Sequence, residues 1–107
     1  MTLQELRERL DVLHGVGRCY GPFPEQQEVP YITYHSTQTE TIYADGKPVY
    51  ATEPVTLDLV TRRRDLDLEA ALERILCEGC AQFDKSMNFD DVEEIHTATY
   101  IFETEVQ

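Results

Sequence analysis

The residues with the clearest chemical potential are Cys77 and Cys80, which form a Cys-Glu-Gly-Cys motif. Two thiols at this spacing can bind a metal ion or take part in thiol–disulfide exchange. A structural zinc site needs four ligands, however, and the sequence has no second such pair and no paired histidines. A redox pair normally opens a helix, whose N-terminus lowers the thiol pKa, whereas this pair closes a predicted helix. We therefore interpret Cys77 as a small apolar residue of that helix, and keep a metal- or redox-linked regulatory module as an alternative.

The other reactive residue types are dispersed along the chain. His14, His35 and His96 are isolated from one another, and no serine or cysteine stands in a nucleophile elbow. No Gly-rich phosphate loop is present. Carboxylates are abundant, but an acidic surface accounts for them as well as a catalytic pair does. We therefore expect no enzymatic activity, no cofactor and no metal.

The charge balance is strongly acidic. With 21 acidic and nine basic residues, the formal net charge is −12. Such a field repels the nucleic-acid backbone and anionic membranes, so we expect neither sequence-specific nucleic-acid binding nor membrane binding. The first residues lack the features of a secretory signal, and no apolar run approaches the roughly 20 residues that span a bilayer. The same charge leaves open an acidic inhibitor or DNA-mimic adaptor that binds a basic protein.

Three arginines in a row, Arg62, Arg63 and Arg64, concentrate a third of the basic charge between a predicted strand and a predicted helix. They form either a solvated turn or a docking site for an acidic surface. That surface could belong to an identical subunit, in which a basic patch meets an acidic one in a head-to-tail contact that closes a ring. Residues 103–105 are acidic candidates for this contact, as is a second cluster. The second cluster consists of Asp90, Asp91, Glu93 and Glu94.

Two amphipathic helices are predicted. The first begins at a capping box of Thr2 and Glu5 and ends at Gly15 or Gly17. The second spans about 66–78, begins at Asp65 or Asp67, and has Gly79 as a plausible cap residue. Leucines at helical spacing define the buried face of the first helix. These are Leu3, Leu6, Leu10 and Leu13. The apolar stripe of the second contains Leu68, Ala71, Leu72, Ile75 and Leu76.

Strands are predicted where β-branched and aromatic residues alternate between the two faces. The predicted strands cover residues 31–35, 41–43, 49–50, 55–61, a short stretch near 82–83, and 95–105. Pro54 is expected to separate the strand at 49–50 from the strand at 55–61.

Asp45-Gly46 is a strong two-residue turn signal and predicts a hairpin over about 38–54. Tyr43 and Tyr50 flank its tip. They are either cross-strand partners that stabilise the ribbon or part of an arm that reaches a neighbouring molecule. Because consecutive strands are joined by hairpins, we expect a single α+β domain over residues 1–107. Its antiparallel sheet has about four strands plus the protruding hairpin, and both helices pack on one face.

The order of these elements resembles a family of small phage and prophage proteins. These are the tail terminator and head–tail joining, or tail completion, proteins of long-tailed phages. The resemblance covers nearly the whole chain and is carried by an ordered set of segments. The segments are the N-terminal helix, Pro30–Tyr34, Tyr43–Tyr50, Val55–Thr61, the helix 66–78 and Tyr100–Glu103. The cysteine motif and the arginine triplet are departures from the family's features.

The resemblance implies a non-enzymatic virion part in the tail or neck, made in the bacterial cytoplasm. Members of the family form rings, often hexameric, that cap the tail tube and bind the head connector. The implied partners are identical subunits and other tail or connector proteins. A negatively charged inner wall of such a ring would repel DNA and let it slide through.

Overall fold

Strand β4 (Lys47–Thr61) is the longest element of the computed structural model, and it pairs with three other strands. The structure describes residues 1–13, 15–21, 29–36, 40–79 and 82–105, and gives the backbone alone for residues 19, 40–44 and 47–51. The element order is α1 (Leu3–Leu10), β1 (Gly17–Tyr20), β2 (Tyr31–Ser36), β3 (Glu40–Ala44), β4, α2 (Leu66–Glu78), β5 (Phe83–Asp90) and β6 (Ile95–Glu105).

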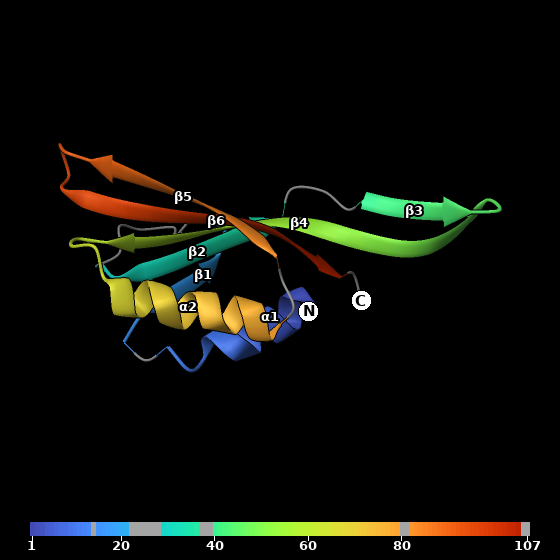
Figure 1. The fold of residues 1–107 in the computed structure, drawn as a ribbon, viewed down its shortest axis with the longest axis horizontal. Coiled ribbons are helices and arrows are strands. Elements are labelled where there is room, and N and C mark those ends of the chain that lie inside the picture. Colours follow the sequence, from blue (N-terminus) through green and yellow to red (C-terminus); the bar gives the residue numbers. More distant parts are fainter. Residues whose placement is uncertain (14, 22–28, 37–39, 80–81, 106–107) are drawn as a thin grey trace.

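The strands form one sheet in the order β1-β2-β4-β6-β5, and β3 pairs with β4 alone. Both helices lie on the same face of this sheet (Figure 1). The predicted α+β class, with two helices on one face, is therefore confirmed. The expectation of a purely antiparallel sheet is wrong, because β1 runs parallel to β2 while the other pairs are antiparallel.

The helix starts agree with the capping signals in the sequence. The hydroxyl of Thr2 accepts a hydrogen bond from the Glu5 backbone N–H at 3.2 Å, and the Asp65 carboxylate accepts one from the Leu68 N–H at 3.0 Å. Each satisfies an N–H that has no partner within the helix. Helix α1 ends at Leu10, earlier than predicted, yet Leu13 is still buried.

Gly79 ends α2, but it does not adopt the left-handed cap conformation, since its φ is −81°. A steric contact explains instead why this residue is glycine. A Cβ at this position would lie 2.6 Å from the sulfur of Met1, which packs against the end of the helix. The glycine therefore permits a close approach between the residue that precedes α1 and the end of α2.

Strand β4 continues through Pro54, so the predicted break is wrong. Pro54 lies between Val55, the last partner of β2, and Thr52, the first partner of β3. In the part of the chain that is described, β4 has a ladder partner only on the β6 side at this point, through Glu103. A missing N–H on the unpaired side removes no ladder bond, which is where proline is tolerated in a sheet.

Strand β5 covers eight residues, where only a short strand near 82–83 was predicted. Its central residues include lysine, serine and asparagine, which are not strong strand formers. They are extended because the whole of β5 pairs with β6, from Phe83 opposite Phe102 to Asp90 opposite Ile95. Tertiary pairing here overrides local propensity.

The core lies between the sheet and the helices and is built from alternate strand residues, as predicted for Val55, Leu57 and Leu59 of β4. Its fully buried members come from both layers. They include Leu6, Leu10, Ile32, Leu57, Leu72, Leu76 and Tyr100. Neither described helix has the length and apolar character needed to cross a membrane.

The hairpin of β3 and β4 extends away from the helical layer to one end of the molecule, whose longest dimension is 52 Å (Figure 1). Asp45 and Gly46 have φ values of 52° and 74°, as the predicted turn requires. Tyr43 and Tyr50 are not paired directly, because the register shifts after Ile42. Tyr50 lies opposite Ile42, and Tyr43 opposite Pro48. The register thus places the two tyrosines opposite other residues, and their role in the ribbon stays a prediction.

Neighbouring residues near the end of α2 test this packing. Leu76 is fully buried and Cys77 is exposed. We expect Leu76→Ala to lower the free energy of unfolding by about 2–5 kcal/mol, because it leaves a cavity between helix and sheet. Cys77→Ala should change it by less than about 0.5 kcal/mol. Urea unfolding followed by circular dichroism measures both, and equal effects would contradict the assigned burial.

Candidate interaction surfaces

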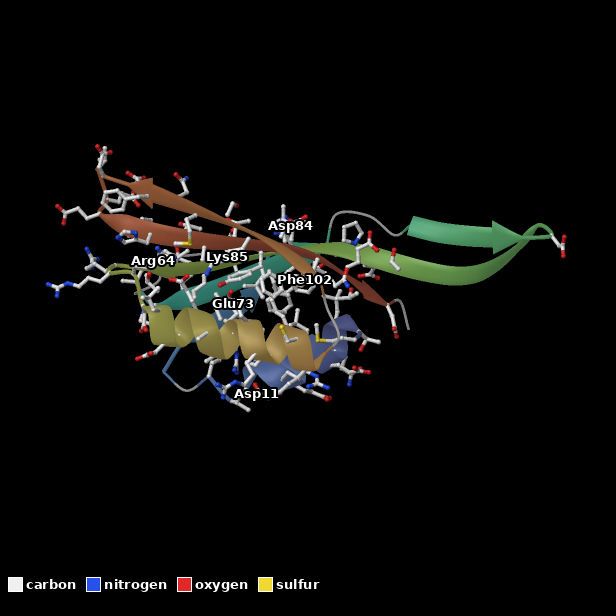
Figure 2. The ribbon with its side chains drawn as sticks, in the orientation of Figure 1. Asp11, Arg64, Glu73, Asp84, Lys85 and Phe102 are labelled. Atoms are coloured by element: carbon white, nitrogen blue, oxygen red, sulfur yellow. The ribbon has the colours of Figure 1, made fainter. Side chains whose placement is uncertain are left out.

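The buried carboxylate of Glu69 on α2 is the centre of an ion-pair network. Figure 2 labels its other members, Arg64, Glu73 and Lys85. The side chain of Glu69 is only 5% exposed. The Lys85 ammonium lies 2.7 Å from one of its oxygens, and the Arg64 Nε donates to the other at 3.3 Å. Lys85 also donates to Glu73 at 3.3 Å. The network therefore joins α2 to strand β5 and to the β4–α2 turn.

The charged forms of this network are mutually stabilised. Burial of Glu69 opposes its ionisation, but the contacts with Lys85 and Arg64 outweigh burial and hold the pKa of Glu69 below its ordinary value. The hydrogen bond to Glu69 raises the pKa of Lys85, against the opposing effect of burial. Both groups are therefore charged at neutral pH.

Tyr100 lies beside this network on β6. Its hydroxyl is buried, and no described residue meets the full geometry of a hydrogen bond to it, although Lys85 lies close enough to act against the rise in its pKa. Burial, followed by the negative charge of Glu73, raises the pKa of Tyr100 to about 12. The Lys85 ammonium lies 5.7 Å from the ring centre, and the ring meets Phe83 edge to face at 5.3 Å. Tyr100 is therefore a core residue whose hydroxyl adds little to stability.

The sequence-based reasoning did not identify Glu69 or Lys85. A signal for Glu69 was present, because it stands three and seven residues before Leu72 and Leu76, on the apolar side of the helix. A charge in that position indicates a buried ion pair. No comparable signal marks Lys85, whose inward direction depends on its pairing with Tyr100.

The three arginines predicted as partner contacts have different surroundings. Arg64 is half-exposed and holds Glu69, so it contributes to the fold. Arg62 and Arg63 are exposed and form no ion pair with any residue that the structure describes. These two side chains are the part of the triplet that is available to a partner.

The acidic cluster of Asp90, Asp91, Glu93 and Glu94 forms the exposed β5–β6 turn. The Asp90 carboxylate accepts hydrogen bonds from the backbone N–H groups of Val92 and Glu93, which stabilises the turn. Both this turn and the arginine triplet adjoin the Thr61–His96 pair, so they lie at the same end of the sheet.

The other predicted contacts lie at the opposite end. Glu105 of the acidic segment 103–105 pairs with Thr52, close to the base of the hairpin. Asp45 is exposed at the hairpin tip. Tyr43 and Tyr50 belong to the same hairpin, and their side chains lie outside the described part of the structure. A head-to-tail contact joins opposite ends of two copies. Of the two acidic clusters, only residues 103–105 lie at the end opposite the arginine triplet, as such a contact requires.

Exposed apolar side chains gather at the end that carries the arginines. Met87 and Phe89 follow Lys85 on the helix-side face of β5, and they are 39% and 50% exposed. Leu66 at the start of α2 and Val92 in the β5–β6 turn are also exposed. We call Leu66, Met87, Phe89 and Val92 the apolar end.

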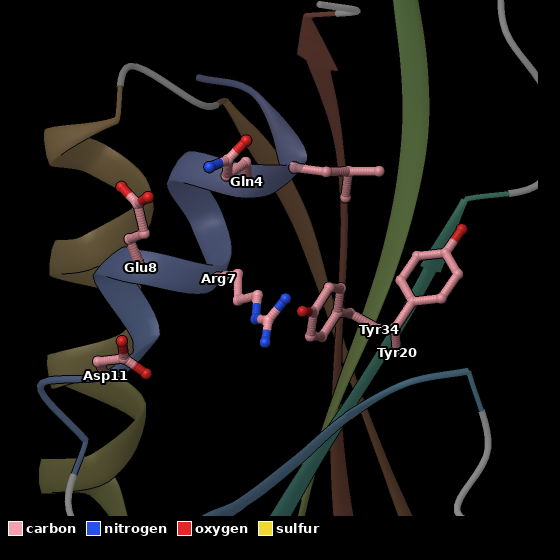
Figure 3. Close-up of a pocket in the computed structure, with 7 residues that line it drawn as sticks. Gln4, Arg7, Glu8, Asp11, Tyr20 and Tyr34 are labelled. Atoms are coloured by element: carbon pink, nitrogen blue, oxygen red, sulfur yellow. The ribbon is translucent and has the colours of Figure 1, made fainter.

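A cleft of about 620 Å³ lies between α1 and the strands β1 and β2 (Figure 3). Arg7 reaches from α1 toward Tyr20 and Tyr34, whose rings meet edge to face at 5.6 Å. Arg18 forms an ion pair with Asp11 at 2.6 Å and caps the last turn of α1 through the Leu10 carbonyl. These contacts tie α1 to the sheet.

The cysteine and histidine residues are dispersed where they are described. Cys77 is exposed, so our interpretation of it as a small apolar residue that extends the apolar stripe of the helix is wrong. Cys80 and His14 lie outside the described residues. His35 and His96 are on different strands. Within the described ranges, no group of three histidine, cysteine or acidic residues could hold a metal ion.

The sheet face opposite the helices, which we call the outer face, is acidic. The alternation along β4, β5 and β6 directs Asp58, Asp84, Asp90 and Glu103 to this face. Asp58 accepts a hydrogen bond from the Thr99 hydroxyl at 2.7 Å. In β2, β5, β6 and residues 54–61 of β4, no arginine or lysine side chain belongs to the outer face.

The Glu69 network makes the stability of the fold depend on pH. Because the pKa of Glu69 is lower in the folded state than its ordinary value of 4.5, its contribution is complete above pH 4.5 and is lost as the pH falls through the folded-state value. We expect Glu69→Gln to lower the free energy of unfolding at pH 7 by about 1–2 kcal/mol. The variant should also lose less stability than the wild type between pH 5 and pH 3.

Urea unfolding at several pH values measures this difference. Glu78→Gln, an exposed change on the same helix, is the matched control and should follow the wild-type profile. Parallel acid profiles for wild type and Glu69→Gln would contradict the assigned ion pairs.

The hydroxyl of Tyr100 gives a second test. Since it is buried without a well-aligned hydrogen bond from any described residue, we expect Tyr100→Phe to leave the free energy of unfolding unchanged or to raise it by up to about 1 kcal/mol. Tyr100→Ala should lower it by about 3–5 kcal/mol through loss of packing. Chemical denaturation compares the variants. A loss above about 1 kcal/mol in Tyr100→Phe would mean that the hydroxyl has a hydrogen-bond partner.

The fold is shared with a known structure. A chain titled "Virion of native gene transfer agent (GTA) particle" superposes with a TM-score of 0.62 over 96% of this chain and 89% of that chain. The two sequences are 11% identical over this alignment. No protein-family model and no curated protein sequence matches this chain. At this identity the likeness establishes the fold, which extends over nearly the whole of both chains.

Proposed function

We propose that this protein is a structural assembly component of a phage or phage-like virion and acts by association rather than by catalysis. The observation that carries the proposal is the fold, which matches a chain of the gene transfer agent virion over 96% of the present chain. The independent resemblance to small tail and neck proteins, seen in the order of elements, supports the same class.

The exposed features of the molecule suit protein contacts. The hairpin presents extended backbone, Arg62 and Arg63 present positive charge that no described residue pairs, and the apolar end presents uncovered hydrophobic surface. Open strand edges and exposed apolar residues favour pairing with another chain. A contact role makes use of each of these features without any reacting group.

Within this class, we propose the finer role of a tail terminator or head–tail joining protein. Identical subunits would form a ring in the tail or neck and would contact other tail or connector proteins. The acidic outer face supports one orientation of the subunit in this ring. If Asp58, Asp84 and Glu103 line the channel, their charge repels the DNA backbone and keeps passing DNA from binding to the wall.

Light scattering coupled to size-exclusion chromatography, run across protein concentration, tests the proposal. We expect a concentration-dependent oligomer, either alone or after addition of the structural proteins encoded next to it. Electron microscopy of that oligomer should show closed rings with the outer face toward the lumen. A strict monomer that binds none of those proteins would contradict the structural role.

Two other outcomes would separate the finer proposals. A ring whose outer face points away from the channel would reject the DNA-repelling wall and leave the structural role intact. Tight and strongly salt-dependent binding of the monomer to a basic protein would instead favour an acidic inhibitor or DNA-mimic adaptor.

A further inference from the structure

The hairpin is a two-stranded ribbon whose outer sides carry no ladder partner among the described residues. Strand β3 pairs only with β4, and residues 47–51 of β4 pair only with β3 in the same part of the chain. We call residues 40–52 the ribbon. Its exposed edges carry N–H and C=O groups that can continue a ladder with another strand.

Strand β5 is an open edge on the main body of the sheet. It pairs with β6 on one side, and no described strand pairs with its other side. Seven of its eight residues are exposed. The edge is long enough for β3, which has five residues, to pair along its whole length. Strand β1, the other terminal strand, has only four residues.

The surroundings of β5 favour an apolar partner and carry both charges, since Arg62 and Arg63 share this end with the acidic β5–β6 turn. Met87 and Phe89 are exposed beyond the point where Lys85 ties β5 to α2. Arg62 and Arg63 lie at the same end and form no ion pair with the described residues. The ribbon supplies the matching residue types, since it contains two acidic residues, Glu40 and Asp45, and one basic residue. Its sequence also includes Ile42, Tyr43, Val49 and Tyr50.

The positions of the two surfaces determine the type of contact. The ribbon extends from one end of the 52 Å axis, and the β4–α2 and β5–β6 turns lie at the other (Figure 1). A surface at one end that binds a different surface at the other end makes a heterologous contact, which repeats from copy to copy. A symmetric contact between two ribbons would leave β5 exposed, and one between two β5 edges would leave the ribbon exposed.

We infer that the ribbon of one copy adds to the open edge of β5 in the next copy, with β3 extending the sheet and Asp45 close to Arg62 and Arg63. Met87 and Phe89 are then covered by the ribbon. This inference rests on the proposed function, because it names the contact through which the subunits associate.

Matched serine substitutions test the receiving edge. Phe89 and Ile101 are 50% and 49% exposed, but Phe89 lies on the helix-side face of β5 and Ile101 on the outer face of β6. We expect Phe89→Ser to weaken self-association of the full chain at least about tenfold, because it removes a central apolar contact. Ile101→Ser should leave it within about twofold. Sedimentation velocity across concentration measures both, and circular dichroism checks that each variant is folded.

A charge exchange in trans tests the direction of the contact. Asp45→Lys alone should weaken association, and so should the double variant Arg62→Asp with Arg63→Asp. In an equimolar mixture, the ribbon with Asp45→Lys can pair with a copy in which Arg62 and Arg63 are replaced by aspartate. The unchanged Asp45 of that copy can pair with the unchanged arginines of the Asp45→Lys copy. We therefore expect the mixture to recover association to within about threefold of the wild type. If Asp45→Lys weakened association only by straining the hairpin turn, changing Arg62 and Arg63 in the other copy would not restore association.

The outcomes separate this inference from the proposed function. Self-association that Phe89→Ser and the charge variants leave unchanged overturns the ribbon–β5 contact while the structural role stands. If the charge variants weaken association and mixing them does not restore it, the ribbon–β5 contact is also overturned, because that result indicates a symmetric contact between like surfaces. A wild-type chain that does not associate with itself overturns the inference, and binding to adjacent structural proteins then decides the proposed function separately.

Discussion

One continuous strand links the core of this protein to its exposed ribbon. The C-terminal part of β4 is buried between β2 and β6 and contributes Val55, Leu57 and Leu59 to the core. Its N-terminal part leaves the core and pairs with β3 alone. Because backbone pairing is unbroken through Pro54, the ribbon is an extension of the sheet rather than a separate loop. Its direction is therefore fixed by the packing of the core against α1 and α2.

The opposite end depends on a different interaction. Strand β5 buries few of its own side chains, so its position depends on the ladder with β6 and on Lys85, which reaches under the sheet to Glu69 and Glu73. An inward charge on an edge strand is also a known obstacle to uncontrolled pairing. It restricts a partner at Lys85 and leaves the stretch with Met87 and Phe89 accessible. The same residue thus anchors the edge and limits where another chain can add.

Local signals in the sequence predicted the elements that depend on local physics. The capping residues Thr2 and Asp65, the Asp45-Gly46 turn and the alternation in β6 all correspond to the structure. The errors arose where long-range pairing decides. Strand β5 has weak propensity and is defined by β6, and the continuity of β4 at Pro54 depends on where β2 ends and β3 begins. The candidate contacts were found as charge clusters, but their arrangement at two ends required the register of the sheet.

The two ends differ in chemistry, and this difference constrains any assembly. A symmetric dimer that pairs two ribbon ends leaves the apolar end and its arginines exposed. A symmetric dimer that pairs two apolar ends leaves the ribbons exposed. A repeated head-to-tail contact covers both, and it closes into a ring only if each contact adds a constant rotation about a common axis. In the proposed contact, this rotation would be set by the twist between neighbouring strands, roughly 20–25°, together with the angle between β3 and β5 within one copy. The acidic outer face is continuous with that extended sheet, so the twist of the sheet would also determine on which side of the assembly the negative charge lies.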